Sequence, residues 1–427
     1  MSYQMKMDTD ISNLLIKTGH EEVASCILDE AMRQFDTVEL IASENFPSDA
    51  VRAATASCFT AKYCEGFPAK RVSGKTGRYY GGCQHADELE EYCCRKWREV
   101  FQTDYHVNVQ PHSGSQANQA AYAAVLKTGD TILSMDLNSG GHLSHGSKVN
   151  FSGKTYNVVS YGVDEHGYID YEDIAYKIVA FRPKLVIAGA SAYPRIIDFQ
   201  RIYGLICEIS KKVEQSAPFE IWDIHRPYFM VDMAHIAGLV AAGDHPSPFG
   251  LADIITTTTH KTLRGTRGGL IFCKPELAKK VDGAVFPGCQ GGPLMHVIAA
   301  KAVTADEDCT EEFRQYIHQV VRNTKAMSGE FIRLGYDLVT GGTDNHLLLL
   351  DFSRTHPNIT GNDVQQALDA VGITLNKNCV PGEKRSPTQT SGVRIGCAAM
   401  TTKGYNERDF IEVARKIDEV IRGIDKT

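Results

Sequence analysis

The chain has 427 residues, of which 43% are hydrophobic and 23% are charged, and 45 basic against 52 acidic residues leave a net charge of −7. This composition is typical of a globular protein, and a mildly acidic chain without a basic stripe argues against nucleic acid as the main ligand. At about 150 residues per domain, the length predicts two or three domains with enough apolar content for a large core.

The apolar segments of the chain are short. The longest, 185–190 and 236–242, fall far below the roughly 20 residues that cross a bilayer, and residues 1–15 lack the apolar core of a signal peptide. We therefore expect a cytoplasmic protein without a membrane partner. The twelve cysteines include no C-x-x-C pair, so free, mostly buried thiols are expected rather than a zinc site.

Amphipathic helices are predicted at 20–35 and 84–101, where apolar residues recur at three- and four-residue steps. From about residue 106, short apolar runs alternate with helical segments. The predicted strands are 107–109, 131–135, 157–159, 185–188, 228–231, 253–256 and 270–272, and the helices include 115–126, 170–180 and 198–213. This alternation predicts an α/β domain around a mostly parallel sheet.

A shorter α+β set follows Pro293. It comprises a long helical stretch through 312–334, strands at 347–350 and 393–396, and helices at 361–371 and 405–423. We therefore predict a second domain with a boundary near residue 310. The chain then divides into an N-terminal helical arm over 1–42, a large domain over 43–309 and a small C-terminal domain over 310–427.

The strongest chemical signal is a run of four threonines that ends in His260 and Lys261, followed by a glycine-rich loop that contains Arg267. A lone lysine is usually a solvated surface charge. Here the small and hydroxylated neighbours allow a ligand to approach closely. A lysine partly buried among them, near other cations, can have a lowered pKa and form a Schiff base.

A second signal is Asp232, which ends an apolar strand upstream of Lys261. A carboxylate in that position is costly without a cationic partner. It could cap a turn or a helix, or it could anchor a protonated ring nitrogen such as the pyridinium of pyridoxal phosphate (PLP). Asp232 and Lys261 together are more specific than either residue alone.

The third signal is the segment 110–119, which follows a strand and opens an alanine-rich helix. Ser113, Gly114 and Ser115 lie at the helix start, where free backbone N–H groups form an anion site suited to phosphate. Taken alone, this pattern indicates only a helix cap. Together the three signals provide partners for a phosphate, a ring nitrogen and an aldehyde, the minimal set for a PLP site.

With these residues in place, the chain closely resembles serine hydroxymethyltransferase, a family of fold-type I PLP-dependent enzymes of one-carbon metabolism. The matching motifs are collinear and cover roughly residues 20–425. They are Leu40–Asn45, Lys62–Gly66, Tyr79–Gly82, Gln110–Asn118, Gly140–Gly146, Val231–Gly238, Thr256–Lys261, Phe286–Pro293, Gly341–His346, Asn376–Asn378 and Ser391–Arg394.

The resemblance implies an α/β fold with a PLP-transferase-like large domain, built on a mostly parallel sheet, and a smaller C-terminal α+β domain. The implied reaction is the reversible transfer of the serine hydroxymethyl carbon to tetrahydrofolate, giving glycine and 5,10-methylenetetrahydrofolate through a PLP aldimine on Lys261. The implied partners are serine, glycine, tetrahydrofolate as co-substrate, and a second copy of the chain in a homodimer with active sites at the interface.

The resemblance also assigns roles to matching residues. Lys261 would carry PLP, Asp232 would keep the ring nitrogen protonated, and His142 would stack on the ring. Glu65 would be the acid/base at the hydroxymethyl group, and Tyr80 would complete the catalytic set. Cofactor contacts would come from Ser43, Tyr63, Ser113, Gly114, Ser115, Ser191, His235, His260 and, from a neighbouring subunit, Gly292. Substrate contacts would come from Arg394 on the carboxylate, Arg267, Glu65 and Tyr79, and folate contacts from Leu137, Gly141, Leu143 and Asn378.

Each role has a simpler alternative. His142 and His145 could bind a metal at i, i+3 spacing, but no third ligand or H-E-x-x-H frame accompanies them, so no metal is expected. Tyr79 and Tyr80 could be core aromatics, and Arg394 could belong to a structural ion pair.

The chain departs from the family pattern at three places. Residues 72–78 are inserted between Glu65 and Tyr79, where we expect a longer loop at the subunit interface or the mouth of the site. The insertion makes residues 69–76 approximate a P-loop, but no strand precedes them, so nucleotide binding is discounted. A second insertion at about 214–228 is aromatic and suits a surface excursion or an assembly contact. Thr388 stands where many relatives have an aromatic residue near the folate.

Two competing functions remain open. A folate-independent PLP aldolase that cleaves threonine-like β-hydroxy amino acids would use the same cofactor residues, but the motifs at 140–146 and 376–378 favour the transferase. A non-catalytic or RNA-binding scaffold is opposed by the intact set of Lys261, Asp232 and Arg394 and by the net charge of −7.

Overall fold

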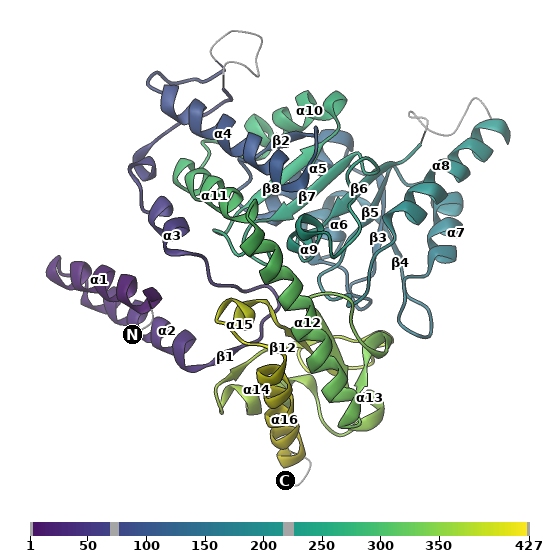
Figure 1. Ribbon diagram of the computed structural model, residues 1–427. Coiled ribbons are helices and arrows are strands. Elements are labelled where there is room, and N and C mark those ends of the chain that lie inside the picture. Colours follow the sequence, from purple (N-terminus) through teal and green to yellow (C-terminus); the bar gives the residue numbers. More distant parts are fainter. Residues whose placement is uncertain (1–2, 69–76, 217–225, 425–427) are drawn as a thin grey trace.

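The large part of the protein is built on a seven-stranded sheet. Figure 1 shows the computed structural model, which describes residues 3–68, 77–216 and 226–424. The sheet has the strand order β2-β8-β7-β6-β5-β3-β4, and β3 to β7 run parallel while β8 is antiparallel to both β2 and β7. The strands are β2 (His106–Asn108), β3 (Thr131–Met135), β4 (Asn157–Tyr161), β5 (Leu185–Ala188), β6 (Tyr228–Asp232), β7 (Ile254–Thr258) and β8 (Gly269–Cys273). The predicted α/β fold with a mostly parallel sheet is thus confirmed.

Alternate residues of the central strands enter two different cores. Phe229 and Val231 of β6 face one core, whereas Met230 between them faces the other. Because both faces of the sheet are covered, each strand needs an unbroken apolar run, which explains why the sequence shows runs rather than alternation. One core includes residues of α4 (Gln84–Phe101), α7 (Tyr171–Phe181), α8 (Phe199–Ser216) and α9 (Ala237–Ala242), and the other includes residues of α5 (Gly114–Val125) and α10 (Ala278–Gly283).

A smaller antiparallel sheet lies in the C-terminal part, with the strand order β12-β13-β10-β9. Its strands are β9 (Asp337–Leu338), β10 (Leu347–Asp351), β12 (Asn376–Asn378) and β13 (Gly392–Gly396), and its helices are α13 (Phe352–Thr355), α14 (Gly361–Asp369), α15 (Ala398–Thr402) and α16 (Glu407–Ile424). The helix α12 (Glu311–Arg333) joins the two parts, because Ile317 belongs to the core of the large sheet and Phe331 to that of the small one (Figure 1). The domain division at residue 310 stays a prediction.

The N-terminal segment forms a hairpin of α1 (Tyr3–Lys17) and α2 (Glu21–Asp36) that lies to one side of both sheets (Figure 1). The sequence predicted α2 but not α1. Leu14, Val23 and Phe35 are exposed on this hairpin. The chain then continues through β1 (Val38–Glu39), which pairs with β11 (Ile373–Thr374), and α3 (Asp49–Thr55).

Shorter elements add to the large part of the fold. The helices α6 (Phe151–Thr155) and α11 (Met295–Asp308) and a π-helical turn at Ala284–Cys289 belong to the large part. All twelve cysteines are described and are free thiols, six of them buried. Within the described part of the chain, every helix is too short or too polar to cross a bilayer.

The loops that follow the carboxyl ends of β3, β5, β6 and β7 lie at one edge of the large sheet. Open parallel sheets bind their ligands at this edge. Lys261 follows β7, Asp232 ends β6, Ser191 follows β5 and His142 follows β3. The strand order therefore brings together side chains that are far apart in the sequence.

Candidate active site

The side chain of Lys261 lies in a cavity of about 310 Å³ at this edge of the sheet. Among the described residues, none forms a hydrogen bond or ion pair with its Nζ, while its backbone carbonyl accepts a hydrogen bond from Nδ2 of Asn45 at 2.8 Å. Burial lowers the pKa of Lys261 to about 8, against the opposing charge of Asp232. A fraction of the lysine is therefore a neutral, nucleophilic amine near neutral pH.

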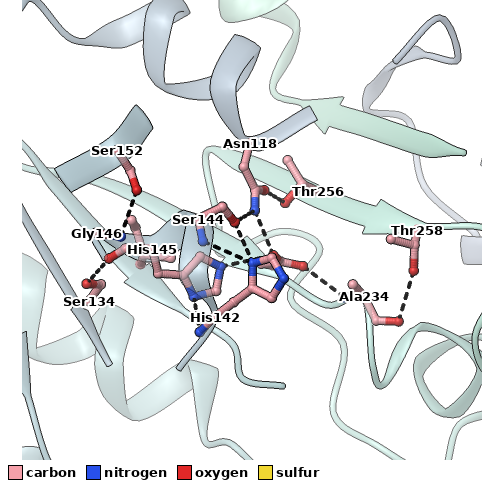
Figure 2. A network of polar contacts seen from close by, with 12 residues as sticks. Asn118, Ser134, His142, Ser144, His145, Gly146, Ser152, Ala234, Thr256 and Thr258 are labelled. Atoms are coloured by element: carbon pink, nitrogen blue, oxygen red, sulfur yellow. Dashed lines mark hydrogen bonds and ion pairs between the residues drawn. The ribbon is translucent and has the colours of Figure 1, made fainter. Parts of the chain in front are cut away.

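Asp232 faces the same cavity and is held by three hydrogen bonds. Oδ2 accepts from Nδ2 of Asn118 and from Nε2 of His145, each at 2.9 Å, and Oδ1 accepts from the backbone N–H of Ala234 at 3.0 Å (Figure 2). Burial alone would raise the pKa of Asp232, but the His145 hydrogen bond and the nearby histidines hold it well below its usual range. The cavity thus contains a fixed carboxylate anion.

The amide of Asn118 is oriented by its other contacts. Its Oδ1 accepts from the hydroxyl of Thr256 at 2.6 Å, so Nδ2 is free to donate to both Asp232 and Oγ of Ser144 (Figure 2). Because one hydroxyl fixes which end of the amide faces Asp232, the carboxylate meets a donor rather than a second acceptor.

The hydrogen bonds of His142 determine its tautomer. Its Nδ1 accepts from the backbone N–H of Ser144 at 3.2 Å and lies 2.6 Å from the Ser144 hydroxyl, which itself accepts from Asn118 (Figure 2). Nδ1 is therefore an acceptor, and the ring proton lies on Nε2. Burial lowers the pKa of His142 to about 4, so the imidazole is neutral at physiological pH.

The positions of these side chains also test the alternative that His142 and His145 bind a metal. His142, His145 and Asp232 have ligand-type atoms within 4.8 Å of one another, so Asp232 is a possible third ligand that the sequence did not reveal. However, Nε2 of His145 and Oδ2 of Asp232 already bond to each other, and Nδ1 of His142 is engaged by Ser144. The described geometry favours a hydrogen-bonded network over a metal centre.

The start of α5 supplies an anion-binding surface. Ser113 is its N-cap, and the hydroxyl of Ser113 accepts from the backbone N–H of Gln116 at 3.2 Å. Gly114 permits close packing, since a Cβ atom there would lie 2.7 Å from Cγ2 of Thr258. Backbone N–H groups at a helix start favour a phosphate.

Arg394 projects from β13 toward the same cavity. Its Nη1 donates to the backbone carbonyl of Ser191 at 2.7 Å, and its Nε donates to Oδ1 of Asn376 at 3.1 Å. Burial lowers the pKa of Arg394 to about 10, and no carboxylate among the described residues pairs with it. The alternative of a structural ion pair is therefore wrong for the described residues, and the guanidinium is free to bind an anionic ligand.

Two neutral histidines lie behind the lysine. His235 and His346 stack with ring centroids 5.4 Å apart, and Nδ1 of His235 lies 3.3 Å from Nε2 of His346. Burial lowers the pKa of both, that of His346 to about 3. His260, whose pKa burial also lowers to about 3, lines the cavity as well.

The cavity gathers twelve of the residues that the sequence singled out. They are Ser43, Ser113, Gly114, Ser115, His142, Ser191, Asp232, His235, His260, Lys261, Arg267 and Arg394. The start of α5, the carboxylate of Asp232, the amine of Lys261 and the guanidinium of Arg394 thus line one cavity. The donor set fits PLP and an amino-acid carboxylate.

The other predicted catalytic residues form a separate cluster. The hydroxyls of Tyr63 and Tyr80 each lie 3.3 Å from a carboxylate oxygen of Glu65, and the two rings are 5.1 Å apart. Gly292 is next to the Tyr63 ring. Tyr79 and Tyr80 are 73% and 46% exposed, so the alternative that they are core aromatics is wrong.

The predicted folate residues also lie outside the cavity lining. Leu137 and Leu143 are exposed in the loop after β3, and Asn378 ends β12. Gly141 is buried between the two leucines, and a Cβ there would lie 2.3 Å from the backbone oxygen of Met135. The folate assignments stay predictions.

The two ends of the segment between Glu65 and Tyr79 lie next to each other. Gly66 and Arg78 form an isolated antiparallel bridge, and the backbone N–H of Tyr79 donates to the carbonyl of Glu65 at 3.1 Å. Residues 69–76, which contain the P-loop-like segment, and residues 217–225 of the second insertion lie outside the described residues. The expectations for both insertions stay predictions.

Sequence reasoning missed the residues that orient the anion. Asn118 lies within the 110–118 motif but has no predicted role, and the sequence indicates His145 only as a possible metal ligand. Asn118 carries a usable signal, because it is a polar residue on the buried face of an alanine-rich helix. Ala190, Ala234 and Thr258 also line the cavity and were not singled out.

A comparison with protein families identifies the family of the chain. The family model described as serine hydroxymethyltransferase matches residues 16–417. The match includes every residue of the cavity and of the Glu65 cluster.

Proposed function

Because the chain belongs to the serine hydroxymethyltransferase family of PLP-dependent enzymes, which interconvert serine and glycine with folate, we propose that it transfers the serine hydroxymethyl carbon reversibly to tetrahydrofolate. The products are glycine and 5,10-methylenetetrahydrofolate. The observation that supports this proposal is the single cavity in which Lys261, Asp232, the start of α5 and Arg394 meet.

When bound, PLP supplies an aldehyde that condenses with amines and a cationic ring that withdraws electrons from a bond at the amino-acid Cα. Asp232 holds the proton on the ring nitrogen, because a carboxylate fixed by three donors remains ionised. Ser113, Gly114 and Ser115 bind the phosphate. Neutral His142 offers its ring face and its Nε2 proton to the cavity.

Arg394 orients the substrate. Two of its nitrogens are fixed by protein oxygens, so the guanidinium plane is set before the carboxylate of serine arrives. Holding that carboxylate determines which bond at Cα stands perpendicular to the cofactor ring. Lys261 accepts or returns a proton as its amine is exchanged for that of the substrate, a task suited to a pKa of about 8.

Glu65 acts, in this proposal, at the hydroxymethyl group in the cavity of a second subunit of a homodimer. The support is its place in an exposed cluster with Tyr63 and Tyr80, outside the cavity of its own chain. The enzyme works in the cytoplasm, where twelve free thiols remain reduced.

The test uses the purified chain loaded with PLP. Serine labelled at the hydroxymethyl carbon is added with and without tetrahydrofolate, and glycine and labelled 5,10-methylenetetrahydrofolate are measured. Labelled folate product that is absent from the Lys261→Met variant supports the proposal. Cleavage of threonine that proceeds without folate, with no transfer from serine, would instead establish the aldolase.

A further inference from the structure

A buried lysine lies behind the proposed phosphate site, and burial lowers its pKa to about 8, so that most of its amine is protonated at neutral pH. Lys301 of α11 is 1% exposed, and its Nζ donates to the backbone carbonyls of Val109 at 2.7 Å and of Pro111 and Gly269 at 2.9 Å each. Buried ammonium groups are normally paired with a carboxylate. Here the three protons of the ammonium meet three carbonyl oxygens, and no described carboxylate forms an ion pair with it.

The three carbonyls belong to the segments that carry the phosphate site. Val109 and Pro111 lie between β2 and Ser113, and Gly269 is the first residue of β8. The backbone N–H of Gly269 also donates to the carbonyl of Pro111 at 3.1 Å. The backbones of Gly269 and Ser113 pack closely, because a Cβ atom on Gly269 would lie 2.4 Å from the carbonyl oxygen of Ser113. Lys301 therefore ties the approach to Ser113 directly to the sheet.

The same segment is held from a second direction by Gln290. Its Nε2 donates to the carbonyl of Gln110 at 3.0 Å, and its Oε1 accepts from the N–H of His112 at 3.2 Å. Alternate peptide groups thus face Lys301 and Gln290. Both sets of contacts hold the backbone that leads to the start of α5.

The charge of Lys301 also reaches the neighbouring imidazoles. Burial lowers the pKa of His112, and the charge of Lys301 lowers it further. The same holds for His260, after burial and the charges of Lys261 and Arg267. A group that opposes positive charge on these imidazoles also attracts a phosphate dianion.

We propose that Lys301 is a positioning residue for the cofactor phosphate: its ammonium fixes the 109–111 backbone that places Ser113, and it adds a buried positive charge behind the anion. This inference rests on the proposed function, since it takes the ligand at α5 to be PLP. What it adds is that Lys301 strengthens binding of the phosphate group and not binding of the rest of the cofactor.

The experiment compares PLP with pyridoxal, which has the same ring and aldehyde but no phosphate. Dissociation constants of both are measured for the apoenzyme of the parent, of Lys301→Met and of Ile298→Ala. Ile298 is a matched control, because it is buried on the same helix and belongs to the apolar core of the large sheet. Inorganic phosphate, measured as a competitor of PLP, gives a readout independent of the cofactor ring.

For Lys301→Met we expect the dissociation constants of PLP and of inorganic phosphate to rise roughly 10- to 100-fold, as for a lost charge-assisted contact. The constant for pyridoxal should change by less than about threefold. Ile298→Ala should leave the ratio of the two ligands unchanged. An equal loss for PLP and pyridoxal, or no loss for either, would overturn the inference.

A second variant and one measurement on the parent guard against misfolding. Lys301→Gln keeps two donors and removes the charge, so it should show a smaller but still phosphate-selective loss. If neither variant folds, the ζ-nitrogen resonance of Lys301 in the parent apoenzyme decides: it should shift on addition of inorganic phosphate, and a constant resonance rejects the idea. Failure of the parent to bind PLP at all would instead count against the proposed function.

Discussion

Asp232 and His145 are joined by a hydrogen bond of 2.9 Å between Oδ2 and Nε2, although 87 residues separate them in the chain. Nδ1 of His145 accepts a hydrogen bond from the backbone N–H of His142. The ring proton of His145 therefore lies on Nε2, which donates to the carboxylate of Asp232. The anion that faces the cavity is therefore stabilised by a residue that does not itself need to touch a ligand.

Replacing His145 with asparagine should lower the free energy of unfolding of the apoenzyme by about 1–3 kcal/mol at neutral pH, because a buried carboxylate loses one donor. The pKa of Asp232 is depressed in the folded state, so its stabilising contribution is present above about pH 4 and is lost in acid. The gap between parent and variant should therefore narrow on acidification. Urea titrations measure this, with exposed His166→Asn as the control; a gap of the same size in acid would contradict it.

Lys261→Met should abolish activity yet stabilise the apoenzyme. A buried lysine with a pKa of about 8 costs up to about 3 kcal/mol relative to the unfolded chain while it is charged. Because the folded pKa is lowered, the parent gains stability as the pH rises from about 8 toward 10, and the advantage of the variant should disappear over that range. Unfolding at both ends of the range is the measurement, and a pH-independent difference would show that Lys261 is not the cause.

A mixture of inactive variants can locate Glu65. Lys261→Met and Glu65→Gln are each expected to be inactive alone. If Glu65 serves the cavity of the other subunit, a co-expressed mixed dimer contains one intact site, and an equal mixture should recover about a quarter of the parental activity. No recovery in a confirmed mixed dimer would place Glu65 in the cavity of its own chain.

Arg78 holds the backbone on both sides of Glu65. Its guanidinium donates to the carbonyls of Cys64 at 2.9 Å and Gly66 at 2.6 Å, and it pairs with buried Glu90 at 2.7 Å. Arg78→Met should lower the unfolding free energy by about 3–5 kcal/mol, because it removes the guanidinium that pairs with the buried carboxylate of Glu90.

The double variant Arg78→Met/Glu90→Gln should recover part of that loss, and additive losses would contradict the pairing.

The same contacts decide how the insertion is tested. Removing residues 72–78 would take Arg78 away with the loop, whereas removing 72–76 keeps it. Unchanged serine and folate affinity and unchanged assembly after the shorter deletion would reject a role for the loop at the interface or the site mouth.

The sequence alone determined most elements of the large sheet and most of the chemical groups of the candidate site. The strands around Met230 and Ile255 were found because a sheet covered on both faces requires continuous apolar runs, a local property of the chain. Lys261, Asp232 and Ser113 were found because each stands at the end or start of such an element with an unusual polar residue. The helix α1 (Tyr3–Lys17) was not predicted.

Only the tertiary structure decided how these groups are held. The tautomer of His142, the hydrogen bond from His145 to Asp232 and the three carbonyls on Lys301 depend on which strands and helices become neighbours. Strand order and helix packing are set by the whole core at once, so local spacing does not encode them. The buried lysine of α11 and the lysine proposed to carry the cofactor have the same side chain, and only their surroundings separate the two proposed roles.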